Sequence, residues 1–159
     1  MKALIVSDTH GNDGNFFEVT EKEKDVVLII HAGDACGLED YIEETTGIPC
    51  YIVAGNNDYY SNLPHESIIM LGKHRVLLTH GHTHGISYGN MDICRYAEGL
   101  GCDTVICGHT HRPDIDDLRD VLVVNPGSLT YPRQPGRAPS YIIAEVSETG
   151  DVEYEIKYL

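Results

Sequence analysis

Five short apolar segments of this chain each end in a glycine-containing cluster of aspartate, histidine or asparagine. The clusters are Asp8-Thr9-His10-Gly11, Gly33-Asp34, Gly55-Asn56-Asn57-Asp58, His80-Gly81-His82 and Gly108-His109-Thr110-His111. Short apolar runs bounded by such residues are typical of buried strands. In open α/β sheets, the loops after the carboxyl ends of the strands converge on one crevice. The pattern therefore predicts an α/β fold whose polar side chains gather at one edge of a sheet.

Strand and helix patterns alternate along the first part of the chain, and strands dominate its end. Strands are expected at 3–6, 27–30, 50–54, 67–71, 74–79, 103–107, 121–125, 140–146 and 152–158, and helices near 12–24, 38–45 and 90–100. We interpret the acidic stretch from Asp114 to Asp120 as a solvated turn. Because no Ser-, Gly- or Pro-rich linker interrupts the pattern, residues 1–159 are expected to form a single domain.

Charge and cysteine content exclude several classes of protein. The chain has 25 acidic and 11 basic residues, a formal net charge of −14. Broad nucleic-acid or membrane surfaces need a basic footprint, so neither partner is expected. The longest aliphatic run, 26–30, is too short to span a membrane, and the N-terminus turns polar too early for a signal peptide. Five cysteines without a C-x-x-C pair indicate reduced thiols, so a cytoplasmic protein is expected.

Seven side chains at the strand ends are candidate metal ligands. They are Asp8, His10, Asp34, Asn56, His80, His109 and His111. A single Asp or Asn beside glycine is usually a turn residue, but seven donors at equivalent strand ends are difficult to explain as turns. This number is too large for one tetrahedral ion and suits two divalent ions that share a bridging Asp. The mixture of nitrogen and oxygen donors favours Mn, Fe, Zn, Co or Ni, and manganese is our first expectation.

In this order, the five blocks resemble those of the calcineurin-like metallophosphoesterase superfamily. The short length and the segment 125–128 (Asn-Pro-Gly-Ser) are similar to its small bacterial and archaeal phosphodiesterase branch, of the YfcE type. The resemblance extends from Ala3 to about Arg133 and implies a four-layer αββα sandwich of two mixed β-sheets flanked by helices. It also implies that Asp8, His10 and His111 bind one ion, that Asn56, His80 and His109 bind the other, and that Asp34 bridges them.

The string GHTH occurs twice, at 81–84 and 108–111, but the family pattern treats the two copies differently. Both histidines of the second copy match ligand positions. For the first copy the matching ligand is His80, the residue just before the string. His82 is then a candidate for contact with substrate, and His84 is expected to be a loop residue. A metallo-β-lactamase pattern is excluded, because no Asp-His pair follows His84 at the required spacing.

The resemblance implies a hydrolase, most simply a phosphodiesterase that cleaves a P–O ester of a small substrate with a metal-activated hydroxide. Many relatives carry His after the metal-binding Asn of the third block, where this chain has Asn57. An amide cannot serve as a general acid, so we expect that His82 or metal-bound water protonates the leaving group, or that this protonation is weak. Asn57, which can still donate a hydrogen bond, and Asp58 stay catalytic candidates. Asp58 is interpreted either as orienting a ligand or the Asn56 amide, or as a simple turn residue. The segment Ser128–Arg133 is interpreted either as a structural turn or as an approach to a phosphate.

A second interpretation is a catalytically weak or inactive protein-interaction module on the same fold, similar to a retromer subunit. Such relatives have lost metal ligands, whereas every ligand position is filled in this chain. The filled positions favour the enzyme. Neither the natural substrate nor the formation of a homo-oligomer is indicated by the sequence.

Overall fold

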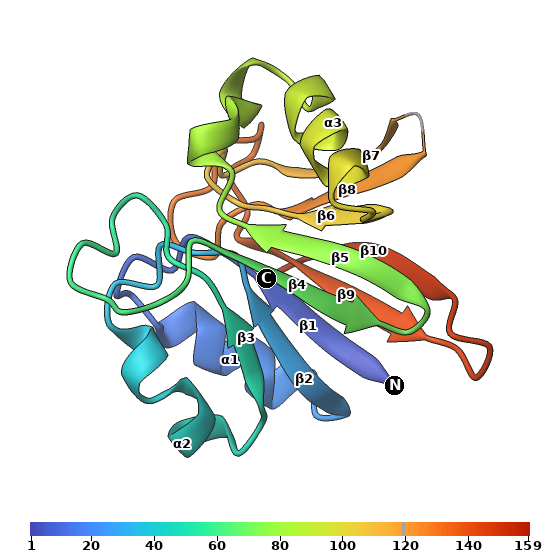
Figure 1. Cartoon of the computed structure of the whole chain (residues 1–159). Helices are drawn as coiled ribbons and strands as arrows, with labels where there is room; N and C mark the ends of the chain where they lie inside the picture. Colours follow the sequence, from blue (N-terminus) through green and yellow to red (C-terminus); the bar gives the residue numbers. More distant parts are fainter. Residues whose placement is uncertain (119) are drawn as a thin grey trace.

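The structure, a computed structural model, describes residues 1–118 and 120–159. Figure 1 shows two β-sheets packed face to face, with helices on their outer faces. In chain order the elements are β1 (Lys2–Val6), α1 (Gly14–Lys22), β2 (Val26–His31), α2 (Ile42–Thr46), β3 (Cys50–Ile52), β4 (Glu66–Leu71), β5 (His74–Thr79), α3 (Met91–Gly99), β6 (Thr104–Ile106), β7 (Pro113–Leu118), β8 (Val121–Pro126), β9 (Ser140–Val146) and β10 (Val152–Tyr158). Short 3-10 helices cover Leu38–Asp40, His82–His84 and Ile86–Tyr88.

Both sheets are mixed. The first has the order β10-β9-β1-β2-β3, in which β1, β2 and β3 are parallel and β9 and β10 are antiparallel to their neighbours. The second has the order β4-β5-β6-β8-β7, with β5, β6 and β8 parallel and an antiparallel strand at each edge. Helices α1 and α2 pack on the first sheet and α3 on the second. The predicted αββα sandwich of two mixed sheets is confirmed.

Alternation of side chains along β1 shows how the layers are held together. Ala3 and Ile5 are fully buried in the cluster between the two sheets. Leu4 and Val6 point to the other face, where they pack with Phe16 of α1. Successive side chains of a strand face opposite sides, so a strand covered on both faces is apolar throughout. Because β1 is apolar throughout, it could be predicted from the sequence.

The prediction of a solvated turn at Asp114–Asp120 is wrong for residues 114–118, which form most of β7. This edge strand pairs antiparallel with β8. Ile115 packs against the core between the sheets, and Leu118 packs against the cluster under α3. An edge strand tolerates charged residues because alternate side chains and one side of its backbone face water. Residue 119 of the same stretch lies outside the described part of the chain.

The other expected elements are present with shifted ends. The helix expected at 38–45 is divided into the 3-10 helix Leu38–Asp40 and α2, and the strands expected at 50–54 and 103–107 are shorter. The pair at 140–146 and 152–158 is an antiparallel hairpin, as predicted. All five cysteines are free. No helix within residues 1–118 and 120–159 is both long and apolar enough to cross a membrane.

Glu23, at the end of α1, is a carboxylate with only 7% of its surface exposed. It accepts hydrogen bonds from Nζ of Lys2 at 2.8 Å, Nζ of Lys157 at 3.1 Å and the hydroxyl of Tyr141 at 3.0 Å. Burial raises the pKa of Glu23, but these three donors outweigh it and lower the pKa from 4.5 to about 2. The ionised carboxylate therefore joins the first sheet to α1.

We expect the free energy of unfolding to fall as the pH is lowered from about 5 to 2, with Glu23 contributing about 3 kcal/mol of the loss. The unfolded chain takes up a proton at Glu23 at a pH where the folded chain does not, so acid favours unfolding. Glu23→Gln should lose this contribution already at neutral pH and should depend less on pH in acid. Urea unfolding of both proteins at about pH 7, 4 and 3 measures the difference. Equal losses on acidification would contradict the assignment.

Candidate metal centre

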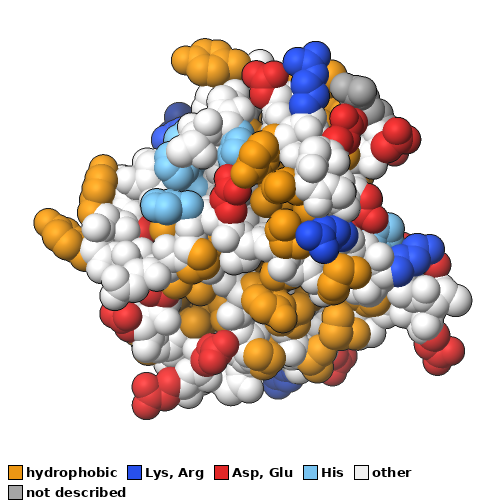
Figure 2. Space-filling model, in the orientation of Figure 1, with side chains coloured by type: hydrophobic (Ala, Val, Ile, Leu, Met, Phe, Trp, Pro, Cys, Tyr) orange, Lys and Arg blue, Asp and Glu red, His pale blue; other side chains and the backbone are white. Residues whose placement is uncertain are grey.

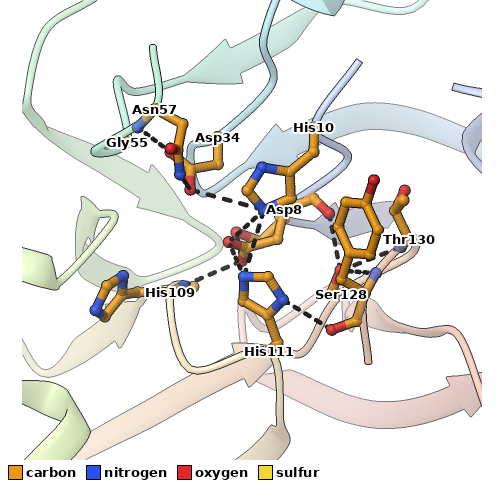
Figure 3. A network of polar contacts seen from close by, with 12 residues as sticks. Asp8, His10, Asp34, Gly55, Asn57, His109, His111, Ser128 and Thr130 are labelled. Atoms are coloured by element: carbon orange, nitrogen blue, oxygen red, sulfur yellow. Dashed lines mark hydrogen bonds and ion pairs between the residues drawn. The ribbon is translucent and has the colours of Figure 1, made fainter. Parts of the chain in front are cut away.

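The seven predicted ligands lie together where parallel strands of both sheets end. Asp8 and His10 follow β1, Asp34 follows β2, Asn56 follows β3, His80 follows β5, and His109 and His111 follow β6. Figure 3 shows Asp8, His10, Asp34 and His111 pointing toward one another from loops of the two sheets. The site thus lies at one edge of the sandwich, and both sheets contribute to it.

The first group of donors consists of Asp8, His10 and His111. Oδ1 of Asp8 lies 3.1 Å from Nε2 of His111 and 3.6 Å from Nε2 of His10. The two imidazole nitrogens are 3.3 Å apart. Oδ1 of Asp8 is buried and has no hydrogen-bond partner among the described residues, although buried polar atoms ordinarily have one. A cation between these three atoms would satisfy this oxygen.

The second group consists of Asn56, His80 and His109. Oδ1 of Asn56 lies 3.1 Å from Nε2 of His80 and 3.0 Å from Nδ1 of His109. Asp34 lies between the two groups, because its Oδ2 is 3.4 Å from Nε2 of His80 and 3.8 Å from Nε2 of His10. The seven side chains therefore form two adjoining groups of donors with Asp34 between them, and Oδ1 of Asp8 also lies 3.9 Å from Nε2 of His80.

Backbone carbonyls orient two of the histidine rings. Nδ1 of His80 donates to the carbonyl oxygen of Ala32 at 2.7 Å, and Nδ1 of His111 donates to that of Tyr131 at 2.8 Å. Because a carbonyl oxygen only accepts, each ring carries a proton on Nδ1 and directs Nε2 into the site. Hydrogen bonds of this kind hold metal-binding histidines in the required orientation.

Five of the predicted ligands have backbone conformations that residues with a side chain rarely adopt. Asp8, His10, Asp34, His109 and His111 have φ between 50° and 65°, the left-handed region. Each such residue costs about 1 kcal/mol or more, so the conformation persists only where the surrounding structure imposes it. The backbone N–H of Asp8 bonds to the carbonyl of Gly33 at 3.0 Å, and that of His10 to the carbonyl of Asp34 at 2.9 Å. Strain concentrated on these residues is typical of a functional site.

Two glycines allow the loops to approach one another this closely. A Cβ at Gly55 would overlap the carboxylate of Asp34, and a Cβ at Gly108 would overlap the hydroxyl of Ser7 and lie against the carboxylate of Asp8. The glycines of the third and fifth sequence blocks therefore have a steric function. They leave room for the two carboxylates at the centre of the site.

The electrostatic environment keeps both carboxylates ionised. Burial raises the pKa of Asp34, but His80 and the hydrogen bonds from Asn57 outweigh it and lower the pKa to about 2. The pKa of Asp8 is also lowered, because its contacts with His10 and His111 outweigh burial. Burial and the neighbouring His80 lower the pKa of His109. Ionised carboxylates and neutral imidazoles are the forms that bind divalent cations.

Comparison with known proteins assigns the family. The model of the calcineurin-like phosphoesterase superfamily domain matches residues 1–149 of this chain. The chain belongs to this superfamily. It is 35% identical over 144 residues to the Probable metallophosphoesterase YsnB of Bacillus subtilis. The aligned region covers 90% of this chain and 83% of the relative. The family is one of metal-dependent phosphoester hydrolases, in agreement with the candidate ligands described above.

Solved structures share the calcineurin-like phosphoesterase fold over nearly the whole chain. An archaeal phosphodiesterase has a TM-score of 0.70 and 27% sequence identity, covering 99% of this chain and 100% of that chain. Vps29 from Entamoeba histolytica, in complex with zinc, has a TM-score of 0.78 and 23% identity, covering 99% of each chain. At that identity the likeness to Vps29 concerns the fold alone.

In this member of the superfamily, Asp58 and Asn57 both contact the loop that carries Asp34. Oδ2 of Asp58 accepts the backbone N–H of Asp34 at 2.8 Å and of Gly55 at 2.7 Å, and Oδ1 accepts that of Cys36 at 2.7 Å. Asn57 donates from its backbone N–H to Oδ1 of Asp34 and from its side-chain amide to Oδ2, each at 2.7 Å. The contacts of both residues position the central carboxylate.

The two histidines of the first GHTH string have different surroundings. The ring centroid of His82 lies 5.4 Å from that of His80 and 6.1 Å from that of His109, and Nδ1 of His82 is buried without a partner in the described residues. His84 instead places Nε2 2.6 Å from a carboxylate oxygen of Glu66, and its ring packs on Tyr96. His82 therefore borders the second group of donors, whereas His84 belongs to the surface of the second sheet.

The segment Ser128–Arg133 stood out in the sequence, but its contacts with the loop after β1 could not be predicted. Oγ of Ser128 donates to the carbonyl of Asp8 at 2.8 Å, and Oγ1 of Thr130 donates to the carbonyl of Thr9 at 2.9 Å. The ring of Tyr131 lies edge-on to that of His10, with centroids 5.4 Å apart. These contacts link residues about 120 positions apart, and no local pattern signals them. The segment is both a turn and one wall of the site (Figure 3).

Proposed function

We propose that this protein is a phosphodiesterase with a two-metal centre. The observation that carries the proposal is the position of Asp34, whose Oδ2 is within 3.8 Å of a ring nitrogen in each of the two donor groups. Asp8, His10 and His111 would hold one ion, Asn56, His80 and His109 would hold the other, and Asp34 would bridge them. Manganese is the first expectation, with Fe, Zn, Ni and Co as alternatives.

The residues fit such a centre on three counts. Oδ1 of Asp8 is buried without a partner among the described residues, the Nε2 atoms of His80 and His111 face the carboxylates, and all donors are nitrogen or oxygen. When bound, two adjacent divalent cations would supply a water-derived nucleophile at neutral pH and charge stabilisation for the phosphoryl oxygens. Asn57 and Asp58 would hold Asp34 in the position in which its carboxylate can contact both ions.

A diester is preferred over a monoester for a reason of charge. A phosphodiester carries about one negative charge and a monoester nearly two at neutral pH, and the chain has a net charge of −14. The likeness to an archaeal phosphodiesterase also supports this choice. We place the protein in the cytoplasm on the strength of its free cysteines.

A second candidate function is a protein-interaction module on the same fold, with which the shared fold of Vps29 is compatible. The two functions are separated by adding Mn, Co, Ni, Zn or Mg to metal-free protein and measuring hydrolysis of bis(p-nitrophenyl) phosphate against p-nitrophenyl phosphate. We expect metal-dependent turnover with the diester as the better substrate. No turnover with any metal would favour the interaction module, and a preference for the monoester would overturn the diester assignment.

His82→Ala should reveal whether His82 protonates the leaving group. We expect hydrolysis of an aryl diester to be nearly unchanged, because its leaving group needs little protonation. Hydrolysis of an alkyl diester should fall about 100-fold or more, the usual contribution of a general acid. The measurement is kcat on matched aryl and alkyl diesters of one nucleoside phosphate, with His84→Ala as the control. An equal effect of His82→Ala on both substrates would remove His82 from this role.

A further inference from the structure

A hollow beside the candidate metal centre is lined by three arginines. Arg112, Thr130, Tyr131, Pro132, Arg133 and Arg137 surround a volume of about 650 Å³, and all three arginines are exposed. In the described part of the chain, no carboxylate lies within ion-pair distance of any of them. By contrast, Lys2, Lys157 and Arg95 each pair with an acidic side chain.

Such a concentration of positive charge is unexpected in this protein. The chain has 25 acidic residues against 11 Lys and Arg, so most cations have acidic side chains available. Three arginines that line one hollow raise the local positive potential, which attracts an anion. Arginine also presents a planar set of donors that matches the oxygens of a phosphate. The composition of the hollow is therefore that of an anion site.

Short contacts connect the hollow to the first donor group. Arg112 follows His111 directly, and the backbone N–H of Arg133 donates to the carbonyl of His111 at 2.9 Å. The carbonyl of Tyr131 accepts the hydrogen bond from Nδ1 of His111, and the ring of Tyr131 contacts that of His10. In Figure 2, Lys and Arg atoms border the group of histidine side chains on the surface. A ligand in the hollow would thus lie next to the metal centre.

A neighbouring hollow is less suited to an anion. Arg112 and Arg133 also line this second space, under the 3-10 helix Ile86–Tyr88, but Asp114 lines it as well. The hollow that contains Arg137 has no acidic residue in its lining. An anion is therefore favoured in the hollow that Arg137 lines, rather than in the neighbouring one that Asp114 lines.

We propose that this hollow binds a second phosphate group of the substrate. The natural substrate would then be a compact phosphodiester that carries a further phosphate, with the scissile group at the metals and the other group among the three arginines. This inference rests on the proposed function, because the metal centre defines which phosphate is cleaved. The binding of the second phosphate can nevertheless be measured without any turnover.

The test compares ligands with one and two phosphates by calorimetric titration of the manganese-treated protein. The ligands are thymidine 3′,5′-bisphosphate, thymidine 5′-monophosphate and thymidine 3′-monophosphate. The variant is Arg112→Gln/Arg133→Gln/Arg137→Gln. The control is Lys22→Gln/Lys24→Gln/Arg95→Gln, which removes the same charge from exposed positions on α1, the residues after it, and α3.

We expect the wild type and the control to bind the bisphosphate at least about tenfold more tightly than either monophosphate. In the arginine variant this preference should fall to about twofold or less, while circular dichroism and thermal unfolding stay like those of the wild type. If the variant does not fold, Arg137→Gln alone should still reduce the preference. Equal affinities for all three ligands in the wild type, or the same loss in the control, would overturn the inference. Failure of the proposed function would appear separately, as absence of turnover of bis(p-nitrophenyl) phosphate.

Discussion

His80→Ala should lower phosphodiester hydrolysis by at least about 100-fold and reduce the bound metal from two ions to one. Loss of a residue that only hydrogen-bonds to a metal ligand costs about 10–100-fold, and loss of the ligand itself should cost more. His80 is fully buried, and its Nε2 lies 3.1 Å from Oδ1 of Asn56 and 3.4 Å from Oδ2 of Asp34. Removal of the ring therefore takes one of the predicted nitrogen ligands out of the second group of donors. Metal content after gel filtration and kcat on an aryl diester measure both effects.

The matched control for this variant is His84→Ala. His84 stands in the adjacent GHTH string, but its ring contacts Glu66 and Tyr96 and no candidate ligand. We expect two bound ions and a kcat within about twofold of the wild type, as for a surface substitution. Because removal of a buried ring also destabilises the fold, His80→Gln and thermal unfolding of each variant separate misfolding from metal loss. Equal metal loss in the His80 and His84 variants would contradict the ligand assignment.

Metal binding should raise the melting temperature of the metal-free protein by roughly 5–10 °C. An ion present at about 100 times its Kd stabilises the native state by about 2.7 kcal/mol, and each kcal/mol is worth about 2–4 °C in a chain of this size. The physical reason lies in the site, where two ionised carboxylates are buried and Oδ1 of Asp8 has no hydrogen-bond partner among the described residues. A bound cation would neutralise the charge of the two buried carboxylates and give Oδ1 of Asp8 a partner.

Differential scanning fluorimetry with and without manganese measures the shift, and Asp34→Asn should lose most of it. Asp34 is 1% exposed and contacts both donor groups, so its amide variant keeps the shape but removes the bridging charge. Asp92→Asn is the control, because Asp92 lies on the surface of α3, where it pairs with Arg95 and with no other cation of the described residues. An unchanged melting temperature in the wild type, or equal shifts in both variants, would show that metal does not bind at Asp34.

Local pattern accounts for what could be predicted about the fold. β1 and β2 are apolar on both faces because each is covered by the other sheet and by helices, and this produces a continuous apolar run in the sequence. β7 was missed for the opposite reason. Its residues 114–118 lie at a sheet edge, where three aspartates are tolerated and only Ile115 and Leu118 signal burial. Elements with a weak local pattern depend on tertiary packing, which the sequence does not display.

The candidate donors could be located from the sequence because polar residues after apolar runs must lie at strand ends. The sequence pattern alone predicted that seven donors lie at one edge of an α/β fold. The family resemblance implied the αββα sandwich and the match of His80, rather than His84, to a ligand position. The tertiary structure decided the rest. It placed Asp34 between the two donor groups, directed Asp58 and Asn57 onto its loop, and forced five candidate ligands into left-handed backbone conformations. It also brought Arg137 into one hollow with Arg112, the residue that follows His111. The contacts of Asp34 with Asn57 and Asp58 join loops of the first sheet that are more than 20 positions apart in the sequence. The contact of Asp34 with His80 joins the two sheets, so it exists only once they have packed against each other.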